Sequence, residues 1–285
     1  MQFLGTGAAE MYPNPFCDCE VCERARRTGE VPRLRSAFML DEHSMVDFGT
    51  DVLASSSLYK IPLTRLDHVF ITHTHEDHFS LGNISVLEMT DKRAGHYPIH
   101  FHMSQEGYLW LMKYIEADGQ PYGRVLKKLM SMGRAAFHPV MPYTEFEAGG
   151  MTIFTVESNH HVRQSEYALN YLFNLGGRGK LFYVADSGVY SDKNIEILGG
   201  AKADYLVMEG TFGSLPRERS SGHLNAEFFV EQVEIFAKSG IIKTDARIFV
   251  THINQCNTFT HEEYQAYLNE KSGYDITVAY DGMIV

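Results

Sequence analysis

Short apolar stretches rich in β-branched and aromatic residues recur along the chain, and most are bounded by Gly, Pro, Asn or Asp. This pattern is typical of buried β-strands in a folded domain. The stretches that fit it are Ala37–Leu40, Ser44–Phe48, Leu66–Thr72, Ile99–Met103, Met151–Glu157, Tyr167–Leu175, Lys180–Asp186, Tyr205–Glu209, Arg247–Thr251 and Ile276–Tyr280.

Helical patterns lie between some of these strands. We expect helices at Asp51–Lys60, Ser80–Asp91, Ser104–Glu116, Ser191–Leu198, Asn225–Ser239 and His261–Glu270. Early strands follow one another as hairpins and later strands alternate with helices, which favours two sheets packed face to face with helices outside. We expect a single domain, residues 1–285, with an aromatic and basic insertion or lid at about residues 104–135.

The charge balance argues against a long nucleic acid as partner. The chain has 36 acidic and 25 basic side chains and a net charge of -11, whereas binding to phosphate backbones needs a basic surface. No stretch approaches the ~20 apolar residues of a membrane span, and no secretory signal stands at the start. We therefore expect a cytoplasmic protein with no membrane partner and no long nucleic acid as partner, and a homodimer stays open.

The strongest chemical signal is one short motif that follows an apolar strand, Thr72-His73-Thr74-His75-Glu76-Asp77-His78. His73 and His75 are two residues apart and can project to the same side of an extended segment. Asp77 and His78 can face the same volume as the chain turns into the next helix. Two imidazoles and an Asp-His pair suit one or two divalent ions such as zinc or manganese.

The motif resembles the H-x-H-x-D-H signature of the metallo-β-lactamase superfamily. This resemblance implies an α/β fold, a four-layer αββα sandwich, with further ligands at the ends of later strands. His160, Asp186 and His252 stand at those places.

The family pattern assigns each candidate ligand to one of two divalent ions. It gives His73, His75 and His160 to one ion and Asp77, His78 and His252 to the other, with Asp186 between them. His161 is the alternative to His160. Oxygen-reducing diiron relatives carry a carboxylate where His75 stands, so we expect hydrolysis with a non-redox metal pair, zinc or manganese.

The cysteines give a second metal signal. Cys17, Cys19 and Cys22 lie within six residues, which favours metal binding over a disulfide framework. The C-x-C-x-x-C pattern resembles the phosphoribosyl cyclic phosphodiesterases of the carbon–phosphorus lyase pathway and the B-type proteins of pyrroloquinoline quinone biosynthesis. The first resemblance implies a structural zinc with a histidine ligand three residues past His252.

This chain departs from that pattern, because Gln255 stands at the expected position and Cys256 follows it. Four thiolates form an ordinary closed zinc site. We therefore expect Cys17, Cys19, Cys22 and Cys256 to hold one structural zinc. His223 and His261 are weaker alternatives for the fourth ligand.

A third signal lies at the start of the helix expected at Asn225–Ser239. Gly222-His223-Leu224-Asn225-Ala226 resembles the G-H-x-x-A/S element of phosphodiesterases in the superfamily, whose histidine protonates the departing oxygen. Glu209 lies in a segment that resembles their E-x-T-F/Y element. It would accept the N–H of His223 and raise its pKa. A capping or packing role for His223 is the alternative.

These signals predict a metal-dependent phosphodiesterase for a small cyclic or ribose-type phosphodiester. A hydroxide activated by two metal ions would attack phosphorus, Asp77 would orient it, and His223 would protonate the leaving group. Two alternatives stay open. One is a thioesterase or lactonase with the same ligands, and the other is a non-hydrolytic metal-binding protein of quinone cofactor biosynthesis.

Overall fold

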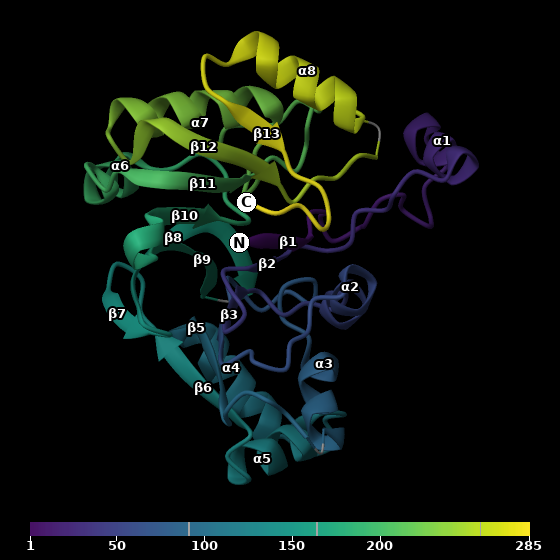
Figure 1. The fold of residues 1–285 in the computed structure, drawn as a ribbon, viewed down its shortest axis with the longest axis vertical. Coiled ribbons are helices and arrows are strands. Elements are labelled where there is room, and N and C mark those ends of the chain that lie inside the picture. Colours follow the sequence, from purple (N-terminus) through teal and green to yellow (C-terminus); the bar gives the residue numbers. More distant parts are fainter. Residues whose placement is uncertain (91, 164, 257) are drawn as a thin grey trace.

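The computed structural model describes residues 1–90, 92–163, 165–256 and 258–285, and in these residues two sheets pack face to face (Figure 1). The first sheet has the order β1 (Gln2–Gly5), β2 (Ala37–Met39), β3 (Ser44–Val46), β4 (His68–Phe70), β5 (Ile99–Ser104) and β6 (Ala135–Val140). The second has the order β13 (Ile276–Val278), β12 (Ile242–Thr251), β11 (Ala203–Glu209), β10 (Lys180–Val184), β9 (Glu166–Asn174), β8 (Met151–Arg163) and β7 (Glu145–Ala148).

Helices cover the outer face of each sheet, which makes four layers. The first sheet is covered by α2 (Val52–Tyr59), α3 (Leu81–Ser85), α4 (Gln105–Glu116) and α5 (Gly123–Ser131). The second sheet is covered by α6 (Asp192–Leu198), α7 (Ala226–Lys238) and α8 (His261–Lys271). Figure 1 shows these two helical layers at opposite ends of the molecule, with α1 (Glu20–Thr28) set apart and the two termini side by side. The predicted αββα sandwich is confirmed.

Three apolar layers hold the sandwich together. Phe70, Tyr171 and Phe173 are fully buried between the sheets. Leu111 lies between the first sheet and its helices, and Phe229 does so for the second sheet. Burial of one such side chain contributes about 1.5–3 kcal/mol, so this packing is the main stabilising term of the fold.

Strand direction determines where the polar loops meet. β3, β4, β5 and β6 run parallel in the first sheet, and β10, β11, β12 and β13 run parallel in the second. Loops that follow parallel strands leave from the same edge of a sheet, which is where α/β proteins gather their functional residues.

The strands expected from the sequence are present, some with shorter bounds, such as β4, and some with longer bounds, such as β8 and β12. The structure adds β1, β6 and β7 together with the helices α1 and α5. Residues 105–131 of the expected insertion form α4 and α5, whose Leu126 and Leu129 are buried against the first sheet.

The helix expected at Ser80–Asp91 is divided into α3 and the 3₁₀ turn η1 (Val86–Met89), and Asp91 lies outside the described residues. None of the helices in the described part of the chain has the length and apolar character of a membrane span.

Candidate metal centre

The residues predicted to bind metal come together at the carboxyl ends of strands from both sheets. The His73–His78 segment follows β4, Asp186 follows β10, and His252 follows β12. His160 lies within β8, the long strand that is antiparallel to β9. Four segments that are far apart in the sequence thus meet at one buried point between the sheets.

One group of donor atoms comes from three histidines and an aspartate. The Nε2 of His73 lies 2.9 Å from Nδ1 of His75 and 3.4 Å from Oδ2 of Asp186. The Nε2 of His160 lies 3.4 Å from the same His75 nitrogen and 3.7 Å from the same Asp186 oxygen. Burial lowers the pKa of His160 to about 4, so its imidazole is neutral and can bind a metal ion.

A second group lies on the other side of Asp186. Asp77 Oδ2 is 3.2 Å from His78 Nε2 and 3.7 Å from His252 Nε2, and these two nitrogens are 3.3 Å apart. Asp186 Oδ1 is 3.1 Å from His252 Nε2 and 3.6 Å from His78 Nε2. The two oxygens of Asp186 therefore face two different groups of donors.

These distances fit two divalent ions. An ion about 2.0–2.2 Å from each donor in a tetrahedral site keeps its donors about 3.4 Å apart. Asp186 is buried, and its Oδ1 accepts no hydrogen bond from the described residues. Burial opposes ionisation of Asp186, but the neighbouring His252 and His78 hold its pKa well below the usual range. A charged, buried oxygen without a donor among these residues is one that a cation would satisfy.

Three of the residues here have positive φ angles although none is a glycine. The φ angle is 62° at Asp47, 38° at Asp186 and 53° at His252. Such conformations cost about 1–3 kcal/mol each and gather at functional sites, where packing holds them. Asp47 and His252 directly follow a strand and Asp186 lies two residues past β10, so the sharp change of direction aims each side chain at the edge shared by the two sheets.

Asp47 is a site residue that the sequence analysis missed. Its carboxylate is fully buried, accepts from Thr72 N and Thr72 Oγ1, and lies 2.7 Å from His78 Nδ1. His78 Nδ1 therefore donates to Asp47, which leaves Nε2 as the nitrogen for metal. The available signal was an acidic residue directly after a buried strand, but no motif distinguishes it from a turn aspartate.

Glu209 and Thr211 orient His252, the other histidine of the second donor group, as Asp47 orients His78. Glu209 Oε2 accepts from the N–H and hydroxyl of Thr211 at 2.8 and 2.6 Å. With its proton given to Glu209, Thr211 Oγ1 accepts from His252 Nδ1 at 2.8 Å. His252 is therefore held in the tautomer whose Nε2 is available to metal. Thr211 is the threonine of the E-x-T-F/Y element, and the sequence analysis gave it no role.

His223 lies beside both donor groups. Its ring centroid is 4.6 Å from that of His160 and 5.7 Å from that of His252. Its Nδ1 is 3.4 Å from Glu209 Oε1, which also accepts Leu224 N at 2.9 Å. Burial disfavours the charged imidazolium, but the Glu209 carboxylate outweighs this effect and raises the pKa of His223 to about 9.

The two adjacent histidines on β8 differ in environment. His160 is 9% exposed and belongs to the first donor group, whereas His161 is exposed and its ring packs against Tyr167. Asn159, the preceding residue, accepts from Gly188 N at 2.7 Å and donates to Ser221 O at 3.1 Å. Asn159 therefore fixes the segment of His160 to the segments that carry Asp186 and His223.

The four cysteines lie together where the segment around α1 meets the loop after β12. The sulfur atoms of Cys17, Cys22 and Cys256 all lie within 4.8 Å of one another, and Cys22 Sγ is 3.4 Å from Cys256 Sγ. Cys19 packs against the same small cluster. Asn254 Oδ1 accepts from Cys256 N at 2.9 Å, so the cluster is joined to the loop that starts at His252.

The alternative fourth ligands lie elsewhere. His261 Nδ1 lies 2.8 Å from Nη2 of the buried Arg33, which donates to it. His223 lies in the main centre instead.

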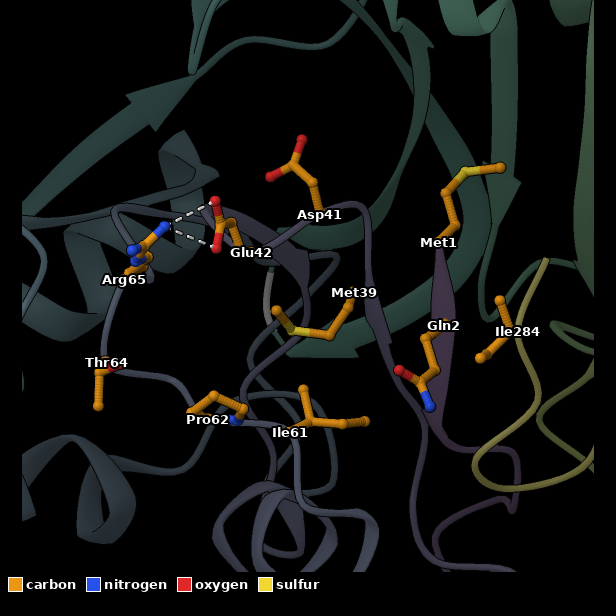
Figure 2. A pocket seen from close by; sticks show the side chains of 10 residues that line it. All are labelled: Met1, Gln2, Met39, Asp41, Glu42, Ile61, Pro62, Thr64, Arg65 and Ile284. Carbon is orange, nitrogen blue, oxygen red and sulfur yellow. Dashed lines mark hydrogen bonds and ion pairs between the residues drawn. The ribbon is translucent and has the colours of Figure 1, made fainter.

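The structure also contains a cavity of about 600 Å³, and Figure 2 shows the side chains that line it. Its lining includes Asp41 and Glu42, which are already paired with arginines: Asp41 with Arg178 at 2.8 Å and Glu42 with Arg65 at 3.1 Å. Among the described residues, this cavity shares no lining residue with the metal groups. The candidate functional site is therefore the group of donors at the strand ends and not this cavity.

Comparison with known proteins agrees with this geometry. Residues 45–253 match a beta-lactamase superfamily domain. A probable metallo-hydrolase of Bacillus subtilis (strain 168), YhfI, is 28% identical over 194 residues, which cover 65% of this chain and 68% of that protein. The crystal structure of YhfI, a metallo-beta-lactamase fold protein, has a TM-score of 0.68 at 17% identity and covers 99% of this chain and 97% of its own.

Two further solved structures share the fold. A diphosphatase from the PhnP family has a TM-score of 0.68 at 21% identity, with 99% of this chain and 95% of that chain covered. Zinc-bound PqqB from Methylobacterium extorquens has a TM-score of 0.71 at 16% identity, with 99% and 98% covered. At these identities the likeness shows a common architecture.

Proposed function

Since the chain belongs to the metallo-β-lactamase superfamily, we propose that this metallo-hydrolase cleaves a small cyclic or ribose-type phosphodiester. The observation that carries the proposal is the position of His223, whose ring lies 4.6 Å from that of His160 while its Nδ1 faces Glu209. An alkoxide that leaves phosphorus needs a proton, whereas a thiolate leaves as the anion. A histidine beside the metal groups therefore favours phosphodiesters over thioesters.

The proposed centre holds two divalent ions, with zinc and manganese as the candidates. His73, His75 and His160 would hold one ion, Asp77, His78 and His252 the other, and Asp186 both. Ions in such a centre polarise a phosphoryl oxygen and lower the pKa of water to about 7, which supplies a nucleophile at neutral pH.

The protein's own side chains position the substrate and move the proton. Glu209 holds Nδ1 of His223, so Nε2 is the nitrogen that donates to the leaving oxygen. Asp77 orients the attacking water by accepting its hydrogen bond. The guanidinium carbon of Arg217 lies 3.5 Å from the ring centroid of Phe212, whose ring is 5.6 Å from that of His223. This arginine therefore places positive charge on Phe212, beside His223, where it would attract an anionic substrate.

We also propose that Cys17, Cys19, Cys22 and Cys256 bind one structural zinc. The thiol spacing within the Cys17, Cys22 and Cys256 group supports a shared ion. Such an ion would join the N-terminal segment to the loop after His252 and so help to hold that ligand in place.

A panel of substrates tests the proposed reaction. The purified chain, loaded with zinc or with manganese, is assayed on a 2′,3′-cyclic nucleotide, bis(p-nitrophenyl) phosphate, a diphosphate ester and an acyl thioester. We expect metal-dependent hydrolysis of the two phosphodiesters. The kcat/KM for the thioester should be at least ~10²-fold lower than that for the cyclic nucleotide, whose alkoxide leaving group needs the proton of His223.

Loss of activity with a chelator and its return with added metal is the control for metal dependence. Hydrolysis of the thioester alone would replace the proposal with the thioesterase alternative, and preferred cleavage of the diphosphate would move the substrate class to phosphoanhydrides.

A further inference from the structure

Glu166 is a buried carboxylate that the proposed reaction does not use. It begins β9, and its exposed fraction is 1%. Its oxygens accept hydrogen bonds from Thr74 N at 3.0 Å, from Thr74 Oγ1 at 2.5 Å and, more weakly, from Ser104 Oγ at 3.5 Å. Carboxylates are rarely buried to this extent without a network that holds them, so the contacts of Glu166 indicate what it does.

Thr74 is the residue between the candidate ligands His73 and His75. This segment is irregular, and its peptide groups need partners from elsewhere in the chain. The β8–β9 hairpin provides two of them: Glu166 accepts from Thr74 N, and Arg163 Nη2 donates to Thr74 O at 2.8 Å. Two residues that are far from Thr74 in the sequence therefore hold both sides of its peptide groups. Glu166 is 92 positions and Arg163 is 89 positions further along the chain.

The same hairpin carries the third histidine of the first donor group. His160 lies on β8, three residues before Arg163, and its Nε2 is 3.4 Å from His75 Nδ1. That spacing is set between two separate segments, the loop after β4 and the strand β8. Sites of this kind require donors held within about 0.5 Å of the productive geometry. Arg163 on β8 and Glu166 on β9 link this hairpin to Thr74, the residue between His73 and His75.

The first turn of α4 packs against this link. Gly107 N donates to Ser104 Oγ at 3.0 Å, which caps the helix. A Cβ at Gly107 would lie 2.9 Å from Thr74 Cγ2 and 3.0 Å from Glu166 Oε1, so the helix start touches both residues. The positive end of the helix dipole therefore adds to the stabilisation of the Glu166 carboxylate. Trp110 lies on the same helix, and the guanidinium carbon of Arg163 is 4.1 Å from the centroid of its ring.

We propose that Glu166 is a positioning residue of the metal centre: its carboxylate fixes the Thr74 peptide and thereby the spacing of His73, His75 and His160. The inference rests on the proposed metal centre. It assigns to Glu166 no contact with substrate and no part in proton transfer.

The variant Glu166→Gln tests this role. Its amide has the shape of the carboxylate but one acceptor oxygen, so one of the two donors of Thr74 loses its partner. We expect the affinity for the first ion to fall about 10–100-fold, measured by competition with a chromophoric chelator. In the cobalt-substituted protein, the visible spectrum of the ion in the first group should change. The kcat at saturating metal should fall more than KM rises.

A matched pair of variants at Thr74 separates this role from a general loss of stability. Thr74→Ser keeps the hydroxyl that donates to Glu166 and should retain the wild-type metal affinity. Thr74→Val has the same shape without the donor and should bind the metal ion more weakly than the wild type. The double variant Thr74→Val/Glu166→Gln should bind metal about as weakly as Glu166→Gln alone, because both changes break one link. Glu145→Gln, on the exposed edge strand β7, is the control.

Three outcomes decide between the inferences. A folded Glu166→Gln variant with wild-type metal affinity and cobalt spectrum would overturn the positioning role while leaving the proposed function intact. Equal loss of affinity in Thr74→Ser and Thr74→Val would also overturn it, because the hydroxyl would then be irrelevant. A wild-type protein that binds no ion at the histidines would overturn the proposed metal centre itself.

Discussion

The Nδ1 of His78 lies 2.7 Å from Oδ2 of Asp47, and both side chains are fully buried. Asp47 also accepts from the backbone and hydroxyl of Thr72, two donors just before His73. One carboxylate therefore orients an imidazole of the second donor group and anchors the segment that enters the first. Its position behind the ligands lets it act on metal binding without contact with substrate.

We expect Asp47→Asn to weaken metal binding. The amide can donate where the carboxylate only accepts, so the tautomer of His78 with Nε2 free for metal is no longer enforced. The affinity for the second ion should fall about 10–100-fold, measured as metal content after dialysis against a series of chelator concentrations. Asp41→Asn is the matched control, because Asp41 pairs with Arg178 on a partly exposed loop. Equal metal content in the two variants would contradict the role of Asp47.

The replacement His223→Ala should reveal a proton donor through its dependence on the leaving group. A 2′,3′-cyclic nucleotide releases an alkoxide, and its kcat should fall about 10²–10⁴-fold. Bis(p-nitrophenyl) phosphate releases a stabilised phenolate that needs little protonation, so its kcat should change far less. The measurement is the ratio of the two rates in variant and wild-type protein.

Two comparisons make this measurement specific. His96→Ala removes an exposed histidine and should leave both rates unchanged. Metal content should also be the same in His223→Ala and wild type. If both substrates slowed by the same factor, His223 would be a structural or metal-binding residue and not the acid.

The sequence predicted the parts of the site that depend on local order along the chain. His73 to His78, Asp186 and His252 each follow a strand, and an apolar run that ends in a polar residue can be recognised without knowing the fold. Asp47 also follows a strand, but no motif distinguishes it from a turn aspartate. The supporting roles of Thr211 and Glu166 leave no local signal in the sequence. Their roles depend on contacts across the fold, such as the 92-residue separation between Thr74 and Glu166.

The strands that were not predicted have a similar explanation. In β6, the half-buried His138 and the exposed Pro139 interrupt the apolar pattern. In β7, alternate charged residues are exposed at the edge of the sheet. Both strands are stabilised by neighbours already in place, β5 and β8, and not by a strong local preference.

Removal of one cysteine should remove one ion. We expect Cys256→Ser to lose about one zinc per chain, because a closed structural site needs all four ligands. Metal analysis of manganese-loaded protein measures this zinc separately from the main centre. The free energy of unfolding should fall as well, since the ion links residues far apart in the sequence. Unchanged zinc content would refute the four-cysteine site.

Four histidines, His68, His100, His102 and His138, stand together on the face of β4, β5 and β6 that is turned towards the other sheet. His68 Nδ1 is 3.2 Å from His102 Nε2, and His100 Nδ1 is 2.8 Å from His138 Nε2. Each contact needs one nitrogen that donates and one that accepts, so each pair contains at least one neutral imidazole.

This cluster should make stability depend on pH. Burial, followed by the charges of His138 and His68, lowers the pKa of His102 to about 3. Burial and neighbouring histidines also lower the pKa of His68 and His138. Unfolded histidines take up protons near pH 6.5, whereas His68, His102 and His138 take them up at lower pH in the fold, so the unfolded state binds more protons below pH 6.5. The free energy of unfolding must therefore fall as the pH drops from about 6.5 towards the folded pKa values.

The variant His102→Phe measures the contribution of one member. A phenyl ring fits there, because Phe70 and Phe146 already lie 5.0 and 5.6 Å from the His102 ring. Urea unfolding between about pH 7 and pH 5 should show a loss of stability that is smaller than in the wild type by up to ~1.4 kcal/mol per pH unit. Glu147 lines the same cavity as His102 and opposes part of the effect. The exposed His96, replaced by Phe, should leave the wild-type slope unchanged. An equal slope in His102→Phe would show that this imidazole takes up protons equally in the folded and unfolded states, which would contradict the prediction.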